Sequence, residues 1–292
     1  MPEGDSVYRL ARRLDAALAG AMLTGCDIRV PEYATVDLTG ERIDEVVSRG
    51  KHILIRVGDH TVHSHLKMEG MWQLYRPGER WKRPAFQARI VLTTTGWQAV
   101  GFELGMLGVL PRDREVAVVG HLGPDLLGPD WDAGEATRRL AAHPSESISV
   151  ALLDQRNLAG LGNEYVAELC FLRGMLPTRL VRDADLLKTV ALAHRLIVAN
   201  KDRAVRTTTG DLRPGSTSWV YRRENQPCRR CGARIRRGQL GSGEGEAANL
   251  TPEMGLPETV TPGTDTPGTG TSGMRIGDRQ IRAIYVCPFC QS

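Results

Sequence analysis

The sequence predicts an α+β fold made of an N-terminal β-sandwich with a flanking helix, a helical middle region and a C-terminal zinc ribbon. Three observations indicate this fold class. A helical pattern followed by short strand-like runs fills residues 1–121. Helical patterns then continue to about residue 200, and two Cys-x-x-Cys pairs stand near the C-terminal end.

The N-terminal helix is expected over residues 5–19, where apolar side chains recur at helical spacing. Asp5 suits its first turn and Gly20 suits its end. Short β-branched runs separated by Gly, Pro or charged turns then predict strands at 52–57, 61–68, 88–93, 99–104 and 116–119. One helix followed by a run of strands is typical of an antiparallel sandwich with a helix packed on it.

A linker with two Gly-Pro pairs is expected at 122–130. Beyond it, helical patterns cover about 132–142, 147–155, 163–172 and 183–200. From about residue 223 the sequence is basic and cysteine-paired. Residues 241–273 interrupt it; they are rich in Gly, Thr, Pro and Glu without periodicity, and this insert is expected to be disordered.

Length and charge bound the class of protein. A chain of 292 residues suits two or three domains. No apolar run approaches the ~18 residues of a membrane span, and the first residues lack signal-peptide features, so we expect a cytoplasmic protein with no membrane partner. The net charge is +4, but residues 238–273 hold five acidic and no basic residues, which leaves +9 for the rest. That surplus fits a polyanionic partner.

The six cysteines fall into two classes. Cys26 and Cys170 stand alone and are expected to be small buried apolar residues. The other four form Cys-x-x-Cys pairs, which favour a metal over disulfides in a chain without a secretion signal. They are Cys228, Cys231, Cys287 and Cys290. Four thiolates complete a closed tetrahedral site, so one structural Zn²⁺ with no open position for catalysis is expected.

The sequence between the cysteine pairs fits a hairpin, with residues 232–237 going out and 279–286 returning. The insert would lie at its tip, where loop closure grows more costly only slowly with length. Arginines crowd this ribbon. A solvated basic face would account for them, but arginines along a hairpin can also hold DNA phosphates.

The N-terminus carries a reactive group. Removal of Met1 is permitted because Pro2 is small, and it exposes a secondary amine with a pKa near ~8, which is partly unprotonated at neutral pH. Attack of that amine on an aldehyde-like carbon gives an iminium, which promotes elimination as lysine Schiff bases do. Glu3 alongside can act as general acid or base. Pro-Glu is a common start, so this interpretation depends on the motifs that accompany it.

Four motifs occur in one order. They are Pro2-Glu3-Gly4-Asp5, Arg49-Gly50-Lys51, Leu152-Leu153-Asp154-Gln155 leading to Gly160-Leu161-Gly162-Asn163, and the ending Cys287-Pro288-Phe289-Cys290-Gln291. Together they resemble the formamidopyrimidine-DNA glycosylase / endonuclease VIII family, over nearly the whole chain except the insert. The resemblance implies a β-sandwich (1–121), a helix–two-turn–helix domain (131–222) and a zinc ribbon (223–292), with DNA in the cleft between them.

The resemblance also implies roles for the matched residues. Pro2 is the nucleophile at the sugar C1′, and Glu3 is the acid at the deoxyribose ring oxygen. Lys51 contacts the phosphate next to the lesion. Without the resemblance, Lys51 would be interpreted as a lysine that faces solvent at the start of a strand. Asn163 binds phosphate, and Arg282 clamps the phosphates around the flipped nucleotide, a task that the guanidinium fork suits.

A base flipped out of a duplex leaves a gap to be filled. Met68, within residues 65–70, resembles the side chain that the family inserts there; the alternative is a core methionine at the end of a strand. A second filling loop of the family often carries Arg and Phe. The corresponding segment, 103–108, has neither, and Leu107 is the candidate in it.

These observations predict a bifunctional DNA glycosylase/AP lyase of base excision repair, acting on damaged DNA as a monomer without a small-molecule cofactor. Within the family, Pro-Glu-Gly at the start is more similar to the endonuclease VIII branch, which removes oxidised pyrimidines. The stretch 200–221 is also too short for the loop that caps 8-oxoguanine, so pyrimidines are favoured. In contrast, Leu-Lys-Met-Glu-Gly and Leu-Asp-Gln are more similar to the formamidopyrimidine branch, which removes oxidised purines such as 8-oxoguanine. The alternatives are an oxidised-purine glycosylase, a non-catalytic protein that recognises DNA damage or structure, and a metal-dependent nuclease. The sequence shows no carboxylate cluster at metal-ligand spacing for the last.

Overall fold

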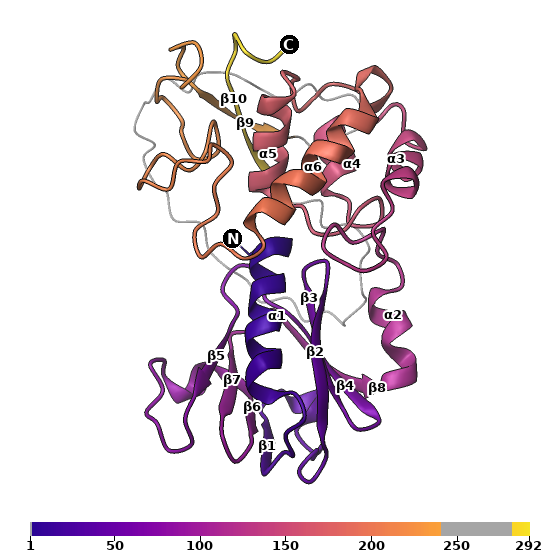
Figure 1. Ribbon diagram of the computed structural model, residues 1–292, viewed down its shortest axis with the longest axis vertical. Helices are drawn as coiled ribbons and strands as arrows, with labels where there is room; N and C mark the ends of the chain where they lie inside the picture. The colour runs from indigo at the N-terminus through magenta and orange to yellow at the C-terminus, as the bar shows by residue number, and fades with distance from the viewer. Residues whose placement is uncertain (1, 241–281) are drawn as a thin grey trace, which may run out of the picture.

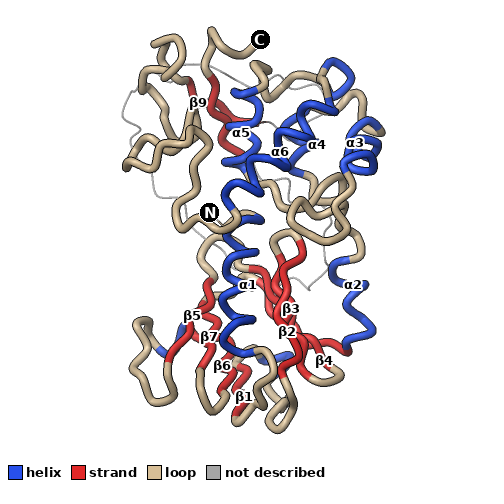
Figure 2. Tube along the Cα trace, in the orientation of Figure 1, coloured by secondary structure: helices blue, strands red, loops and turns tan. Residues whose placement is uncertain are grey.

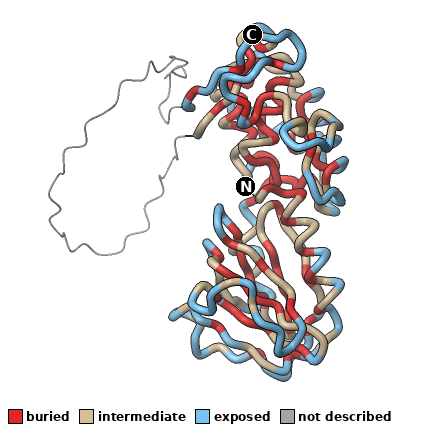
Figure 3. The backbone as a smooth tube through the Cα atoms, turned by 90° about the vertical axis from the view of Figure 1, so that its left-hand side faces the viewer, coloured by how far each residue is buried: buried red, intermediate tan, exposed pale blue. Residues whose placement is uncertain are grey.

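The computed structural model describes residues 2–240 and 282–292 (Figure 1). The β-sheets occupy one half of the molecule, and the longer run of helices and the C-terminal hairpin occupy the other (Figure 2). The chain begins at the junction of the two halves, at the start of helix α1 (Gly4–Leu18). Buried segments are found in both halves (Figure 3), so each half has a core of its own.

Helix α1 confirms the predicted N-terminal helix. The Ser6 hydroxyl accepts a hydrogen bond from the backbone N–H of Glu3 at 3.0 Å, which satisfies a donor at the helix start. Its apolar stripe packs into the core of the sheets, and each fully buried Val or Leu side chain contributes roughly 1.5–3 kcal/mol to the stability of the fold. The fully or nearly fully buried members of this stripe are Val7, Ala11, Leu14 and Leu18.

Two antiparallel four-stranded sheets form the predicted sandwich. The first has the order β2 (Ile43–Arg49), β3 (His52–Val57), β4 (His60–His65) and β8 (Met106–Pro111). The second has the order β1 (Gly25–Ile28), β6 (Ala88–Thr93), β7 (Gln98–Phe102) and β5 (Met71–Tyr75). Residues of both sheets, such as Ile53 and Ile90, meet in one core cluster. Short 3₁₀ turns lie at Pro31–Tyr33, Ala85–Gln87, Arg112–Arg114 and Val181–Asp183.

The strands predicted at 52–57 and 88–93 are confirmed with their limits, and those at 61–68 and 99–104 are present but end earlier. The strand predicted at 116–119 is wrong: helix α2 (Glu115–Val119) lies there. Three valines favour a strand, but tertiary contacts override such propensities. Arg56 donates to both carboxylate oxygens of Glu115 at 2.9 and 2.7 Å, which ties the helix start to the sheet. Val116 is 75% exposed and pairs with no strand.

The four predicted helices of the middle region are confirmed within three residues. They are α3 (Ala133–Ala141), α4 (Ile148–Leu153), α5 (Asn163–Leu172) and α6 (Leu186–Asn200). Asp132 and Asp185 cap α3 and α6 by accepting backbone N–H bonds at 3.0 and 3.1 Å. The helices share a core that includes Leu152, Leu169 and Ile197.

The C-terminal hairpin pairs β9 (Arg236–Leu240) with β10 (Arg282–Val286), so the outgoing strand starts later than residue 232. Gly232 has φ +80° in the turn after Cys231, a left-handed conformation that suits glycine and keeps the chain from entering the strand there. The predicted disorder of 241–273 lies outside the described residues, and the domain limits remain predictions. Among the residues described, no helix is both long and apolar enough to cross a membrane.

Candidate active site and metal centre

Glu3 lies at the contact between α1 and α5, and none of its surface is exposed. Its carboxylate accepts hydrogen bonds from the backbone N–H groups of Gly162 at 2.8 Å, Glu164 at 2.9 Å and Tyr165 at 3.4 Å. These donors are the otherwise unpaired N–H groups at the start of α5. A helix N-terminus favours negative charge, so α5 supplies a binding site for this carboxylate. Pro2, just before it, is half-buried.

The Gly160–Asn163 turn brings α5 to Glu3. A Cβ on Gly162 would lie 2.5 Å from Glu3 Cδ, so the carboxylate occupies the space that a side chain would need. The backbone N–H of Gly4 donates to Gly160 O at 2.8 Å, and Gly160 has φ +117°. The glycines therefore allow a close approach of the backbone at a helix start, and the group that approaches is Glu3.

The turn that carries Lys51 packs on the same segment. Gly50, with φ +58°, lies so close to Ala159 that an added Cβ would be 3.1 Å from the Ala159 Cβ. The Gly50 N–H donates to the buried Asp125 carboxylate at 2.7 Å, and burial raises the pKa of Asp125 despite this bond. Residues 159–162 thus lie between the start of α1 and the β2–β3 turn. Gly4, which follows Glu3, and Gly50, which precedes Lys51, therefore pack against the same segment.

Asn163 is the first residue of α5, and its side chain faces the hairpin. Its Nδ2 donates to the backbone oxygen of Ala283 at 2.8 Å. Ala283 follows Arg282, the first residue of β10. Two motifs that are far apart in the sequence therefore meet here, and the Arg282 backbone lies beside the glycine turn.

Met68 is 57% exposed, so it is not the core methionine of the alternative interpretation. Lys67 before it has φ +55°, and the Gly70 N–H closes the turn on Leu66 O at 2.9 Å. Leu107 is half-buried and packs against the sandwich core. Its neighbour Met106 is 43% exposed, so Met106 rather than Leu107 presents its side chain at this surface.

Two groups at this site were not singled out by the sequence. Arg206, in the loop after α6, binds the buried Asp5 carboxylate through Nε at 2.9 Å and also through Nη2. A lone arginine in a loop gives no sequence signal for such a contact. The second group is a histidine cluster. His52 Nδ1 and His63 Nε2 are 2.8 Å apart, and the rings of His65 and His121 lie 4.9 and 6.4 Å from that of His52.

Burial lowers the pKa of His52, His63 and His65, and nearby cations add to the effect at His52 and His65. Burial, then the neighbouring His65 and His63, lower the pKa of His52 to about 3. Burial, then Lys67 and Lys51, lower the pKa of His65 to about 4. The pattern His63-x-His65 was an available signal, because side chains two apart on a strand lie on one face.

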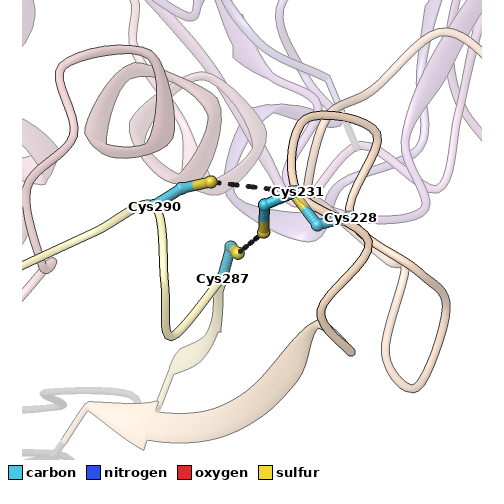
Figure 4. A group of neighbouring side chains, drawn as sticks. All are labelled: Cys228, Cys231, Cys287 and Cys290. Atoms are coloured by element: carbon cyan, nitrogen blue, oxygen red, sulfur yellow. Dashed lines mark hydrogen bonds between the residues drawn. The ribbon is translucent and has the colours of Figure 1, made fainter.

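The four paired cysteines converge as predicted (Figure 4). Their sulfurs all lie within 4.8 Å of one another; Cys231 and Cys287 Sγ are 3.4 Å apart, and Cys228 and Cys290 Sγ are 3.9 Å apart. Four sulfurs about 2.3 Å from a tetrahedral zinc would be roughly 3.8 Å apart, so this arrangement fits a single ion.

The two unpaired cysteines lie elsewhere. Cys170 is buried, as predicted, and burial raises its thiol pKa to about 12. Cys26 is only half-buried, so it does not fully match the expectation, although it packs against the sandwich core.

Comparison with known proteins gives the same family at each level. The formamidopyrimidine-DNA glycosylase N-terminal domain matches residues 1–103. A probable endonuclease 8 2 of Streptomyces coelicolor is 52% identical over 251 residues, covering 84% of this chain and 90% of the relative. The DNA-(apurinic or apyrimidinic site) lyase Nei2 of Mycolicibacterium smegmatis is 51% identical over 236 residues, covering 80% and 92%. A Lactococcus lactis Fpg bound to DNA with an abasic site has a TM-score of 0.72 at 19% identity, with 99% of each chain covered.

A β-sandwich, a helical domain and a four-cysteine hairpin, with a buried glutamate behind Pro2, define a class of DNA-repair proteins. The chain belongs to this class, the formamidopyrimidine-DNA glycosylase / endonuclease VIII family, and within it to the endonuclease VIII branch.

Proposed function

We propose that this chain removes oxidised pyrimidines from DNA through a covalent iminium at Pro2 and then nicks the strand by β,δ-elimination. The chain is a DNA glycosylase with AP lyase activity in base excision repair. The observation that carries the finer proposal is the carboxylate of Glu3, buried next to Pro2 and bound by the N-terminal N–H groups of α5. No other described glutamate has this combination of full burial and proximity to Pro2.

In the proposed reaction, the Pro2 nitrogen attacks C1′ of the damaged nucleotide, and the bond from C1′ to the base breaks. The base leaves with the electron pair of that bond and takes up the proton that the Pro2 nitrogen loses. Glu3 gives a proton to the deoxyribose ring oxygen, so that the ring opens and a Pro2–C1′ iminium forms. The iminium withdraws electrons, C2′ loses a proton, and the C3′–O bond breaks with departure of phosphate. Loss of a second proton lets the C5′–O bond break in the same way. Three N–H bonds to a carboxylate leave lone pairs for this proton exchange, because two oxygens offer about four sites.

Lys51, Asn163 and Arg282 are proposed to bind the DNA backbone at the lesion. Gly50, before Lys51, packs against Ala159, and Asn163 donates to the backbone oxygen of Ala283, which follows Arg282. The DNA-bound Fpg structure with the same fold supports DNA as the partner. Met68, exposed on its turn, is proposed to fill the gap left by the flipped nucleotide, and the exposed Met106 is proposed as the second filling residue.

The proposed preference for pyrimidines rests on two features. The chain shares about half of its residues with proteins named as endonuclease 8 enzymes. The loop after α6 is also short and tightly tied: Asn200 exchanges two hydrogen bonds with Thr207, at 2.9 and 2.8 Å, and the Thr208 N–H donates to Thr217 O at 2.8 Å. Such a loop has little length to fold over a large oxidised purine.

We propose that the metal at the four cysteines is one structural zinc ion. It would join the turn before β9 to the turn after β10, and its four sulfur ligands leave no position for substrate. The proposed reaction uses only the Pro2 amine and the Glu3 carboxyl group, so we propose that the enzyme needs no small-molecule cofactor. We also propose that it is a monomer and acts in the cytoplasm, where bacterial DNA lies.

The test compares two substrates with wild type and Glu3→Gln. One duplex carries an oxidised pyrimidine and the other a preformed abasic site. Glu3→Gln should lose about 10²–10⁴-fold in base release and lose less on the abasic site, where the base is already gone. Base release that is unchanged in Glu3→Gln would contradict the role of Glu3. A wild type that binds but cleaves neither duplex would favour a non-catalytic DNA-binding protein, and faster release of 8-oxoguanine would favour an oxidised-purine glycosylase.

A further inference from the structure

Arg206 makes an ion pair that the proposed chemistry does not use. It lies 201 positions from Asp5 in the sequence, yet its guanidinium faces the first turn of α1. Nε donates to Asp5 Oδ2 at 2.9 Å and Nη2 donates to Oδ1. This is the two-pronged geometry in which an arginine fixes both the position and the orientation of a carboxylate.

The same guanidinium reaches α5. Nη1 donates to Glu164 Oε2 at 2.8 Å and lies 3.8 Å from Glu3 Oε1. One cation thus joins three carboxylates, two on the turn that follows Pro2 and one on the helix that binds Glu3. The Arg206 side chain is only 11% exposed, and Asp5 and Glu3 are buried. Charge-assisted hydrogen bonds are strong in such surroundings, and an unpaired charge there is costly.

The charges around Arg206 act on each other. Burial disfavours its cation, but the hydrogen bond to Asp5 and the charges of Glu3 and Asp5 outweigh burial and raise the pKa of Arg206. Burial also raises the pKa of Glu164; Arg206 opposes this rise, and Glu3 adds to it. The protonation of Glu164, which lies next to the proposed proton donor, therefore depends on Arg206.

The two residues that follow Arg206 attach its loop to α6 and to α5. The N–H of Thr207 donates to Asn200 Oδ1 at 2.8 Å, and the hydroxyl of Thr208 donates to the buried Glu168. The Arg206 guanidinium also lies over the Tyr165 ring, 4.8 Å from its centre. A surface arginine paired by chance would not be fixed through its own loop to both α5 and α6.

We propose that Arg206 is a positioning residue of the active site. Through Asp5 and Glu164 it fixes the position of Pro2 and Glu3 relative to α5, and it sets the charge around Glu3 during proton transfer. This inference rests on the proposed function, since it assigns Arg206 to the reaction of Pro2 and Glu3. Arg206 itself touches no reacting atom, so its effect is on the geometry and protonation of the residues that do.

The test measures single-turnover base release from pH 5.5 to 9, together with KM, for Arg206→Gln, Arg206→Lys and a double variant with Arg206→Gln and Asp5→Asn. The double variant removes both charges, so that no carboxylate of that pair is left buried without a partner. Arg213→Gln is the matched control, because Arg213 is in the same loop, is 82% exposed and pairs only locally with Asp211.

Arg206→Gln should lower kcat about 10- to 100-fold, as expected for a small misplacement of reacting groups, with KM within about twofold of wild type. Its pH–rate profile should shift, Arg206→Lys should recover part of kcat, and Arg213→Gln should match wild type. The double variant, which should fold, should still be slow. A folded Arg206→Gln or double variant with wild-type kcat and pH profile would overturn the inference, as would a change in KM alone. Failure of the wild type itself to release the oxidised base would instead contradict the proposed function.

Discussion

Glu3 Oε2 lies 2.8 Å from the backbone nitrogen of Gly162, although 159 positions separate the two residues. The bond joins the start of α1 to the start of α5, and therefore the sandwich to the helical half of the molecule. The residue proposed to donate the proton is thus also the acceptor for a helix N-terminus. The Glu3 carboxylate therefore serves both the proposed proton transfer and the contact between the two halves of the molecule.

Gly162→Ala should displace Glu3, because the new Cβ would lie 2.5 Å from Glu3 Cδ and 2.6 Å from Oε1. We expect a loss of about 1–3 kcal/mol of stability from overpacking and a loss of about 100-fold in base release from misplacement. Gly96→Ala is the control, since a Cβ there meets nothing within 4 Å. Urea unfolding and single-turnover kinetics check both effects, and a Gly162→Ala protein that behaves like Gly96→Ala would refute the close approach.

Met68→Ala should leave the free energy of unfolding unchanged within about 0.5 kcal/mol, because the side chain is exposed. Base release from duplex DNA should fall by about tenfold, equivalent to roughly 1.4 kcal/mol, while release from single-stranded DNA should not change. Met22→Ala is the control, since Met22 is 51% exposed and lies outside the proposed site. Equal losses on the two kinds of DNA would show that Met68 does not fill a gap in the duplex.

The histidine cluster predicts a dependence of stability on pH. The pKa of His52 is about 3 and that of His65 about 4 in the folded chain, against 6.5 for an ordinary histidine. Below pH 6.5 the unfolded chain therefore binds more protons than the folded chain, so this contribution is complete above pH 6.5 and is lost as the pH falls toward the folded values. Between pH 6.5 and its pKa in the folded chain, each histidine can lower the free energy of unfolding by up to about 1.4 kcal/mol per pH unit.

Urea unfolding at pH 7.5, 6.0 and 5.0 checks this dependence, and imidazole resonances followed by NMR assign it. The His52 and His65 resonances should show no titration between pH 5 and 8. A midpoint near 6.5 for either ring, in folded protein, would mean that the cluster is not desolvated.

Cys287→Ser should lose the metal and the hairpin with it, since a structural zinc contributes roughly 10–16 kcal/mol of apparent binding free energy to small zinc modules. Elemental analysis should find about one zinc per wild-type chain and far less in the variant, and the variant should bind DNA weakly while the sandwich remains folded. Cys26→Ser, in the sandwich and outside the cluster, should retain the metal. A folded wild-type chain without zinc, or with another metal, would contradict the assignment.

The sequence predicted those parts of the fold that depend on local pattern. Helix α5 and strands β3 and β6 have the predicted limits, because their apolar periods and flanking turns lie within the segments themselves. Strand β2, which was missed, has buried residues at Ile43 and Val46 in place of strict alternation. The valines of helix α2 predict a strand because valine has a high propensity for strands. The start of the helix is instead fixed by Arg56, which lies far away in the sequence.

The site shows the same division. The residue type and spacing of the four cysteines predict a metal site directly. Pro2 and Glu3 could be assigned only through the family resemblance of the motifs that accompany them. The motifs could not reveal what binds Glu3, since those donors are backbone N–H groups that any sequence carries. Arg206 was missed for a related reason: its partners come from α1 and α5, and only the packing of these helices brings them together.

The most direct test of the central claim is to trap the intermediate and locate it. Protein from which Met1 has been removed is mixed with DNA that contains an abasic site, reduced with borohydride, and digested with trypsin for mass mapping. We expect the sugar adduct on the N-terminal peptide, residues 2–9, at the Pro2 nitrogen, and no adduct when an N-terminal tag is retained. An adduct on a lysine such as Lys51, or none in metal-replete protein that binds the DNA, would contradict Pro2 as the nucleophile.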